Sequence, residues 1–173
     1  MCGVSVKGAA PTQAIEIRIA YDDDAVYVGA RMYDSHPDSI VARLSRRDNE
    51  SGSDHFAVGF DTFRDRRTGY YFAVTAAGTL FDGTYMNDNW DDDSWDGVWS
   101  GRAHPDEHGW TAEMRIPFSQ MRGMGGASRT WGVNFERFIA RRNESDKLVF
   151  APRGESGNVS RFVDLTGLDD IRS

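Results

Sequence analysis

The sequence has a single cysteine, Cys2, among its 173 residues. One thiol cannot form an intramolecular disulfide, so disulfides do not hold this fold, and cysteine usage does not indicate a compartment. No apolar run approaches the roughly 20 residues that cross a bilayer. The N-terminus also lacks the apolar core of a signal peptide. We therefore expect no membrane span in this chain.

Basic residues are the minority among the charges, with 20 Lys and Arg against 27 Asp and Glu, for a net charge of −7. This balance argues against binding to nucleic acid, which needs clustered cations to neutralise phosphates. Among the four histidines only His104 and His108 have a paired spacing, and they straddle a Pro-Asp-Glu turn, which argues against zinc. At 39% hydrophobic residues the chain can bury one core. We expect one domain over residues 15–173, preceded by a flexible leader or truncated edge strand at residues 1–14.

The clearest pattern is a pair of alternating apolar runs on either side of a charged segment, residues 61–69. The runs place Phe56, Val58 and Phe60 on one strand face, and Tyr70, Phe72 and Val74 on the next. Period-2 alternation of this kind predicts a β-hairpin. Its loop contains Asp61, Asp65 and three arginines, which suits a binding site or a solvated tip.

Similar alternation recurs along the chain and predicts eight to ten short strands with no long amphipathic helix. The run 26–33 is apolar on both faces, which favours a central strand covered on both sides. We expect a strand at 40–47, with a short helix as the alternative, and closing strands at 148–152 and 161–165. A turn is predicted at 143–146 and one helical turn at 117–121. The fold class is an all-β antiparallel sandwich or jelly roll.

Several segments carry a family resemblance, and they run in order from Glu16 to Leu168. They read EIRIAYDDDAVYVGARMYDSHPDSIVARLSRRD, SDHFAVGFDTFRDRRTGYYFAVTAAG, WDGVW, GWTAEMRIPFSQMR, TWGVNFERFIARRNE and SRFVDLTGL. Together they resemble the family-9-like, or DOMON-like, carbohydrate-binding module. The resemblance is closest to the version at the N-terminus of bacterial outer-membrane-associated proteins of unassigned function.

This resemblance implies a β-sandwich of a class that includes sugar-binding and haem-binding domains, often with structural calcium. It also implies that aromatic side chains near the strand ends hold sugars. The family often carries tryptophan near the position of His55, and sugar-binding members can carry arginine where Ala73 stands in this sequence. A periplasmic or cell-surface location in a bacterium, within a larger parent protein, follows from the resemblance alone.

The loop 87–99 contains three of the five tryptophans among five aspartates. An indole face can stack on a pyranose while carboxylates and amides bind its hydroxyls. The candidate ligand contacts are therefore Trp90, Tyr85, Asn87 and Asp88, with His55 and Arg66 from the hairpin. Alternatively, Trp95 and Trp99 belong to the core and the aspartates are merely solvated.

Calcium is the candidate cofactor, because it takes six to eight oxygen ligands from carboxylates and carbonyls in a loop. The acidic residues Asp91, Asp92 and Asp93 form one candidate site. A second candidate site is formed by Asp61 and Asp65, where neighbouring arginines would compete with the cation.

The sequence predicts a non-catalytic module that binds a polysaccharide or oligosaccharide. Three alternatives remain open at this stage. A glycoside hydrolase would use a carboxylate pair such as Glu113 and Glu136. A haem-binding electron-transfer domain would use His55 with one of the methionines Met32, Met86 and Met114. An interaction module would dock through the charged segments 46–48 and 141–143.

Overall fold

The computed structural model describes residues 10–123, 130–152 and 154–168. Residues 1–9 of the predicted leader lie outside these ranges, as does most of the loop 123–128 that the sequence places between two strands. The elements, in chain order, are β1 (Ile15–Tyr21), β2 (Ala25–Tyr33), η1 (Pro37–Ser39), β3 (His55–Asp61), β4 (Gly69–Thr75), β5 (Leu80–Met86), β6 (Trp90–Asp92), β7 (Ser100–Asp106), β8 (Gly109–Pro117), η2 (Phe118–Gln120), β9 (Trp131–Ile139), η3 (Ala140–Arg142), β10 (Glu144–Lys147), η4 (Val159–Arg161) and β11 (Val163–Leu165).

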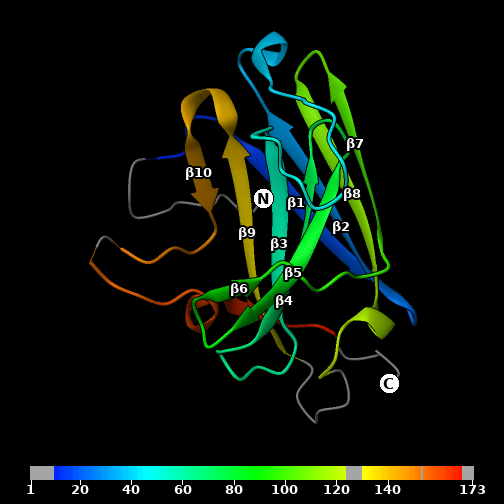
Figure 1. The fold of residues 1–173 in the computed structure, drawn as a ribbon, viewed down its shortest axis with the longest axis vertical. Helices are drawn as coiled ribbons and strands as arrows, with labels where there is room; N and C mark the ends of the chain where they lie inside the picture. Colours follow the sequence, from blue (N-terminus) through cyan, green and yellow to red (C-terminus); the bar gives the residue numbers. More distant parts are fainter. Residues whose placement is uncertain (1–9, 124–129, 153, 169–173) are drawn as a thin grey trace.

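The strands form two antiparallel sheets that pack as a sandwich (Figure 1). The four-stranded sheet has the order β1-β2-β8-β7. The seven-stranded sheet has the order β10-β9-β3-β4-β5-β6, and β11 also pairs with β9. The antiparallel β-sandwich predicted from alternation is therefore confirmed. None of the described residues belongs to a helix of the length and apolarity that crossing a membrane requires.

The core fills the space between the two sheets with one face of each strand. Met32 and Trp110 come from the four-stranded sheet, and Phe56 and Phe72 come from the seven-stranded sheet, all four with no exposed surface. Burial of a large apolar side chain contributes about 1.5 to 3 kcal/mol, so these rows stabilise the pairing of the sheets. Because side chains alternate along a strand, the opposite face of each sheet, called its outer face below, points away from the core.

Two hairpins form early in the chain, and the second of them is the central hairpin predicted from alternation. Between β1 and β2, the Oδ1 atom of Asp22 accepts hydrogen bonds from the backbone N–H groups of Asp24 and Ala25, both at 2.9 Å. The central hairpin joins β3 to β4 in the predicted alternation. The helical turn expected at 117–121 forms as η2.

The strand expected at 40–47 does not form, so that prediction is wrong. Its backbone N–H groups bond to side chains instead of to a neighbouring strand. The N–H of Arg43 donates to Ser53 Oγ at 2.9 Å, and that of Val41 donates to Asp54 Oδ1 at 3.2 Å. These side chains satisfy the backbone N–H groups of the segment locally, so it does not pair with a strand and stays irregular.

Two further strand predictions need correction. The segment 148–152 is irregular, and the strand lies just before it at β10, where the sequence predicts a turn. Strand β2 is central in its sheet, but only one of its faces is buried. Tyr27, Gly29 and Arg31 are partly exposed on its outer face. The apolar composition of this run therefore does not show that both faces are buried.

Candidate functional site

The outer face of the seven-stranded sheet has a floor of small side chains. Ala57 on β3 pairs with Ala73 on β4. Gly59 on β3 pairs with Tyr71, which also pairs with Gly83 on β5. These residues share one face because side chains alternate along each strand. Small side chains at these positions allow other groups to approach the backbone closely.

Tyr85 and Phe162 form a notch at one end of this face. The ring centroid of Tyr85 lies 5.1 Å from that of Tyr71 and 6.0 Å from that of Phe162. A Cβ atom on Gly59 would come within 2.9 Å of the Phe162 ring, so glycine allows this ring to lie against β3. The notch has a volume of about 20 Å³, which is room for one water molecule or one hydroxyl group.

Polar side chains line the same notch. Lys147 Nζ lies 3.2 Å from Glu136 Oε2, and the amide of Asn158 belongs to the same lining. Burial raises the pKa of Tyr85, and the negative charge of Glu136 raises it further. The phenol therefore stays protonated at neutral pH and keeps a proton to donate. The notch thus offers a cation, a carboxylate, an amide and a phenol beside aromatic rings.

His55 belongs to a second aromatic group at the other end of the face. Its ring stacks on Phe138 with a centroid distance of 5.1 Å and meets Phe81 edge to face at 5.2 Å. Burial lowers the pKa of His55, and the charges of Glu136 and Glu50 offset this only in part. The imidazole is therefore neutral at pH 7 and sits in an apolar stack.

The predicted ligand contacts do not gather at one place. His55 begins β3, whereas Tyr85 pairs with Gly69 beyond the other end of that strand. Six residues of strand separate the two ends, a distance of about 20 Å at 3.3 Å per residue. The structure therefore separates His55 from Tyr85 along the sheet.

Trp90 is well exposed, at 71%. It lies on β6 at the sheet edge, opposite the exposed Met86, while its neighbour Asp91 pairs with Tyr85. Adjacent residues of a strand point to opposite faces. Trp90 and Tyr85 therefore project on different sides of the sheet. Trp99, by contrast, is buried in the core, which was the alternative interpretation of this loop.

Asn87 and Asp88 stabilise the loop. The carboxylate of Asp88 accepts hydrogen bonds from the backbone N–H groups of Asn158 and Ser160, at 3.0 and 2.8 Å. Burial alone would raise the pKa of Asp88, but these hydrogen bonds outweigh it and hold the pKa below its usual value. Asn87 Oδ1 accepts a hydrogen bond from Arg67 at 3.2 Å. Asp88 thereby fastens η4 and the following Phe162 to the sheet.

The charged tip of the central hairpin is closed by its own aspartates. Asp61 is buried and accepts the backbone N–H of Arg66 at 2.8 Å. Asp65 accepts the backbone N–H groups of Arg67 and Thr68, both at 2.8 Å. Burial raises the pKa of Asp61. The guanidinium of Arg66 donates to the carbonyl of Ser160 at 3.0 Å, so it too supports η4.

This arrangement does not fit a calcium ion at the tip, because the oxygens of Asp61 and Asp65 already accept N–H groups. In the 87–99 loop, Asp92 accepts hydrogen bonds from the N–H and hydroxyl of Ser94. Asp91 and Asp93 do not join it as a ligand set, since the described part of the chain holds no group of three acidic, histidine or cysteine residues placed around one metal position.

The alternative sites are also placed by the structure. Glu113 lies on the outer face of the four-stranded sheet and Glu136 on that of the seven-stranded sheet, so they point away from each other. They do not form a hydrolytic pair. Met32 and Met114 pack inside the core, whereas His55 lies outside it. Met86 is exposed at the end of β5, far along the sheet from His55, so the candidate haem ligands do not converge.

Of the arginines considered for docking, Arg47 and Arg141 are bonded within the chain, whereas Arg46 is exposed. Arg141 binds Asp34 with both guanidinium nitrogens, at 2.7 and 2.8 Å. Arg47 reaches Asp82 at 2.5 Å and Asp96 at 3.0 Å. Both pairs join segments far apart in sequence, which gives these charges a structural role.

Sequence reasoning missed Phe162, Lys147 and Asn158 as parts of the notch. Phe162 follows η4 and reaches β3 across about a hundred residues of chain, and no local pattern signals that contact. The alternation around Lys147 is compatible with a strand, but its polar residues are also typical of a turn. The pairing of β10 with β9 is what brings Lys147 beside Glu136.

No protein-family model and no curated protein matches the chain. Its fold is similar to that of solved structures. One is a family 9 carbohydrate-binding module from Caldicellulosiruptor kristjanssonii in complex with cellotriose, with a TM-score of 0.60, 19% identity, and coverage of 90% of this chain and 75% of that one. The same kind of module in complex with glucose gives a TM-score of 0.62 and 17% identity, over 90% and 77% of the two chains.

A third similar structure comes from Bacteroides uniformis ATCC 8492 and is named as a candidate carbohydrate-binding protein. It has a TM-score of 0.59 and 14% identity, and the match covers 78% of this chain and 67% of that one. At these identities the three likenesses establish a shared fold, which is the sandwich described above.

Proposed function

We propose that this chain is a non-catalytic carbohydrate-binding module that holds a saccharide on the outer face of the seven-stranded sheet. The observation that carries the proposal is the notch at Tyr85 and Phe162, where aromatic rings meet hydrogen-bonding side chains above a floor of glycine and alanine. The likeness to family 9 modules in complex with cellotriose and glucose supports the same class of ligand.

The chemistry of the notch suits a pyranose. A sugar ring presents apolar C–H groups on its face and hydroxyls around its edge. The partly exposed ring of Tyr85 can stack on the first, and the small Ala57 lies in the same lining. Hydroxyls can donate to Glu136 and accept from Lys147. One hydroxyl fits the notch itself, given its volume of about 20 Å³.

The placement of the two candidate carboxylates supports binding without hydrolysis. Glycoside hydrolysis needs two carboxyl groups about 5 to 10 Å apart, one on each side of the scissile bond. Glu136 is the carboxylate beside the notch, and Glu113 is on the other sheet. The family resemblance further favours a periplasmic or cell-surface location and attachment to a larger parent protein. Calcium has no role in the proposed contacts.

Isothermal titration calorimetry with cellotriose tests the proposal, using the wild-type chain, Tyr85→Ala and Glu136→Gln. We expect each variant to weaken binding by about 1 to 3 kcal/mol, as for an aromatic or charged anchor. Trp90→Ala is the matched control, because that side chain is exposed on the other side of the sheet. Melting temperatures of all variants show that they fold. Equal affinities for wild type and Tyr85→Ala would overturn the placement, and a loss confined to Trp90→Ala would move the site to the sheet edge.

A further inference from the structure

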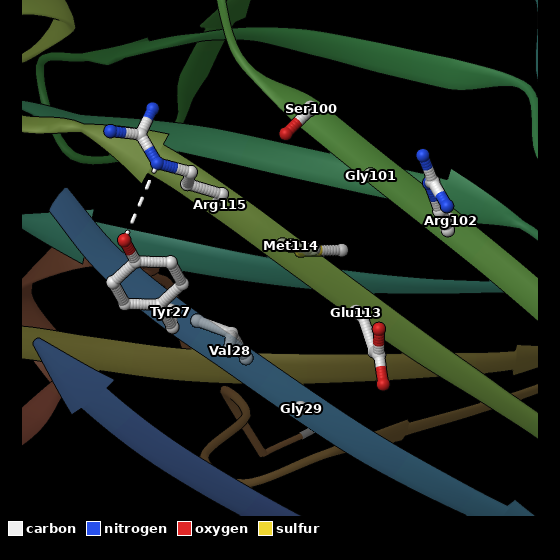
Figure 2. A pocket seen from close by; sticks show the side chains of 9 residues that line it. All are labelled: Tyr27, Val28, Gly29, Ser100, Gly101, Arg102, Glu113, Met114 and Arg115. Carbon is white, nitrogen blue, oxygen red and sulfur yellow. Dashed lines mark hydrogen bonds between the residues drawn. The ribbon is translucent and has the colours of Figure 1, made fainter.

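The outer face of the four-stranded sheet contains a groove of about 310 Å³, on the opposite side of the sandwich from the notch and far larger than it. Its base is the backbone of β2, β8 and β7 around Val28, Met114 and Gly101 (Figure 2). Tyr27 and Arg115 stand along one side, and Glu113 and Arg102 along the other. A volume near 300 Å³ is at the lower end of the range for small-ligand sites.

Gly29, at one end of the groove, has no structural reason to be glycine. It lies within β2 and does not have a positive φ angle, and an added Cβ atom would meet no atom within 4 Å. Other glycines inside strands are required by close contacts: an added Cβ would come within 2.9 Å of Phe162 at Gly59, and would overlap the Tyr71 hydroxyl at Gly83. Glycine inside a strand weakens it, and it often marks a place where a ligand approaches the backbone.

The aromatic wall of the groove is held in position. The Tyr27 hydroxyl donates to Asp22 Oδ2 at 2.8 Å and accepts a hydrogen bond from Arg115 Nε at 3.4 Å. The contact with Tyr27 raises the pKa of Arg115. The Tyr27 ring is therefore preorganised, and the two terminal nitrogens of Arg115 remain available to a ligand.

The charges on the other side are free to bind. Neither Arg102 nor Glu113 takes part in any ion pair among the described residues, although the two are cross-strand partners. The lining holds two guanidinium groups and one carboxylate, and the charges of Asp22 and Asp24 also act on Arg115 from beside Tyr27. Arg102 is therefore the guanidinium whose charge is available to a ligand. A guanidinium group matches a planar carboxylate, so a ligand that carries one suits the Arg102 side of the groove.

We propose that this groove is a second saccharide site, specific for a uronic acid unit of an acidic polysaccharide. The pyranose face stacks on Tyr27, its carboxylate pairs with Arg102, and its hydroxyls donate to Glu113 and Ser100. Gly29 leaves the space through which the sugar chain continues. This site is independent of the notch on the seven-stranded sheet, so either proposal can fail alone.

The test is an NMR titration that follows the backbone amides of Gly29 and Gly101, with trigalacturonate as the acidic probe. Cellotriose is the neutral probe and sodium acetate, at equal ionic strength, is the simple carboxylate. We expect saturable shifts of both amides with trigalacturonate only. Gly29→Leu places a large side chain at a position where an added Cβ meets no atom within 4 Å, and Arg102→Gln removes one cation. Each should weaken this binding at least about tenfold, which is 1.4 kcal/mol, while Arg46→Gln, an exposed arginine elsewhere, should leave it unchanged.

Melting temperatures close to that of wild type show that the variants fold. The proposal is overturned if trigalacturonate produces no saturable shift at Gly29 and Gly101, if acetate reproduces the shifts, or if Gly29→Leu binds like wild type. Equal shifts from cellotriose would also overturn it, because they would show that the carboxylate is not recognised. Cellotriose shifts at Tyr85 and Glu136 report on the other site and are scored separately.

Discussion

The indole N–H of Trp99 donates a hydrogen bond to the carboxylate of Asp82, whose side chain has no exposed surface. Arg47 reaches the same carboxylate at 2.5 Å and also bonds to the carbonyl of Gly97 at 2.8 Å. Burial raises the pKa of Asp82, while the Trp99 hydrogen bond and the Arg47 charge counteract that rise. The irregular segment after η1 is thus fastened to β5 and to the end of the tryptophan-rich loop through one buried carboxylate.

Arg47→Ala should therefore destabilise the fold by about 1 to 2 kcal/mol at pH 7. The expected loss is smaller than the 3 to 5 kcal/mol typical of a fully buried pair, because the Arg47 side chain is one-third exposed. Without Arg47 the pKa of Asp82 rises further. The variant therefore loses more stability at higher pH, where this buried carboxyl group has to ionise. The loss should shrink toward pH 4. Urea unfolding at several pH values measures it, and Arg46→Ala is the neighbouring exposed control. A loss that does not vary with pH would contradict this electrostatic explanation.

Asp146 should make the protein less stable as pH rises through weakly acidic values. Burial, with a further contribution from the charge of Glu144, raises its pKa from 3.8 to about 6. A carboxyl group with a raised pKa stabilises the fold below the unfolded pKa, and that contribution is lost as pH rises toward the folded pKa. Asp146→Asn should remove this decline between about pH 4 and 6, and should be more stable than wild type at pH 7 by about 1 kcal/mol, after a discount for partial exposure.

Denaturant unfolding across this pH range checks the prediction. Asp23→Asn, at an exposed position in the turn before β2, serves as the control and should not change the slope. A variant at Asp146 that is less stable than wild type at pH 7 would show that the carboxylate is needed there in its ionised form, as a partner of the buried Arg137.

The glycines at positions 29 and 59 should respond in opposite ways to alanine. At Gly29 the added methyl group meets no atom within 4 Å, so Gly29→Ala should raise stability by about 0.5 to 1 kcal/mol through reduced backbone entropy of the unfolded chain. At Gly59 it would come within 2.9 Å of the Phe162 ring, so Gly59→Ala should cost about 1 to 3 kcal/mol through overpacking. Thermal unfolding of the two variants compares them directly. Equal losses of stability for the two substitutions would contradict this difference between the glycines.

Chelation should leave the melting temperature unchanged. The carboxylates of Asp61 and Asp65 accept backbone N–H groups that a cation would have to displace. Differential scanning fluorimetry with excess calcium and then with EDTA measures this, with a magnesium-free buffer as the reference. A melting temperature that rises with calcium and falls with EDTA would show that the aspartates rearrange around an ion.

Alternation predicts most of the strands because it reports directly on which face is buried. Phe56, Val58 and Phe60 occupy the core face of β3 as their spacing requires. The prediction for the segment 40–47 is wrong because its pattern says nothing about partners. Its N–H groups find the side chains of Ser53 and Asp54, and sequence alone does not show that these compete with a strand.

The site is only partly predictable for a related reason. The sequence names Trp90 and Tyr85 as candidate ligand contacts, and the structure leaves Trp90 exposed on β6, which pairs with β5. It does not show that Trp90 and Tyr85 point to opposite sides, because this depends on the register of β6 against β5. Nor does it place Phe162 on Gly59, since that contact joins segments about a hundred residues apart and depends on the anchoring of η4 by Asp88.

The most direct test of the central claim is a map of backbone amide shifts on addition of cellotriose to the wild-type chain. We expect shifts at Gly59, Tyr85, Glu136 and Phe162 on the outer face of the seven-stranded sheet, and their loss in Tyr85→Ala. Saturable shifts confined to Trp90 and Met86, or no saturable shift at any residue, would contradict it.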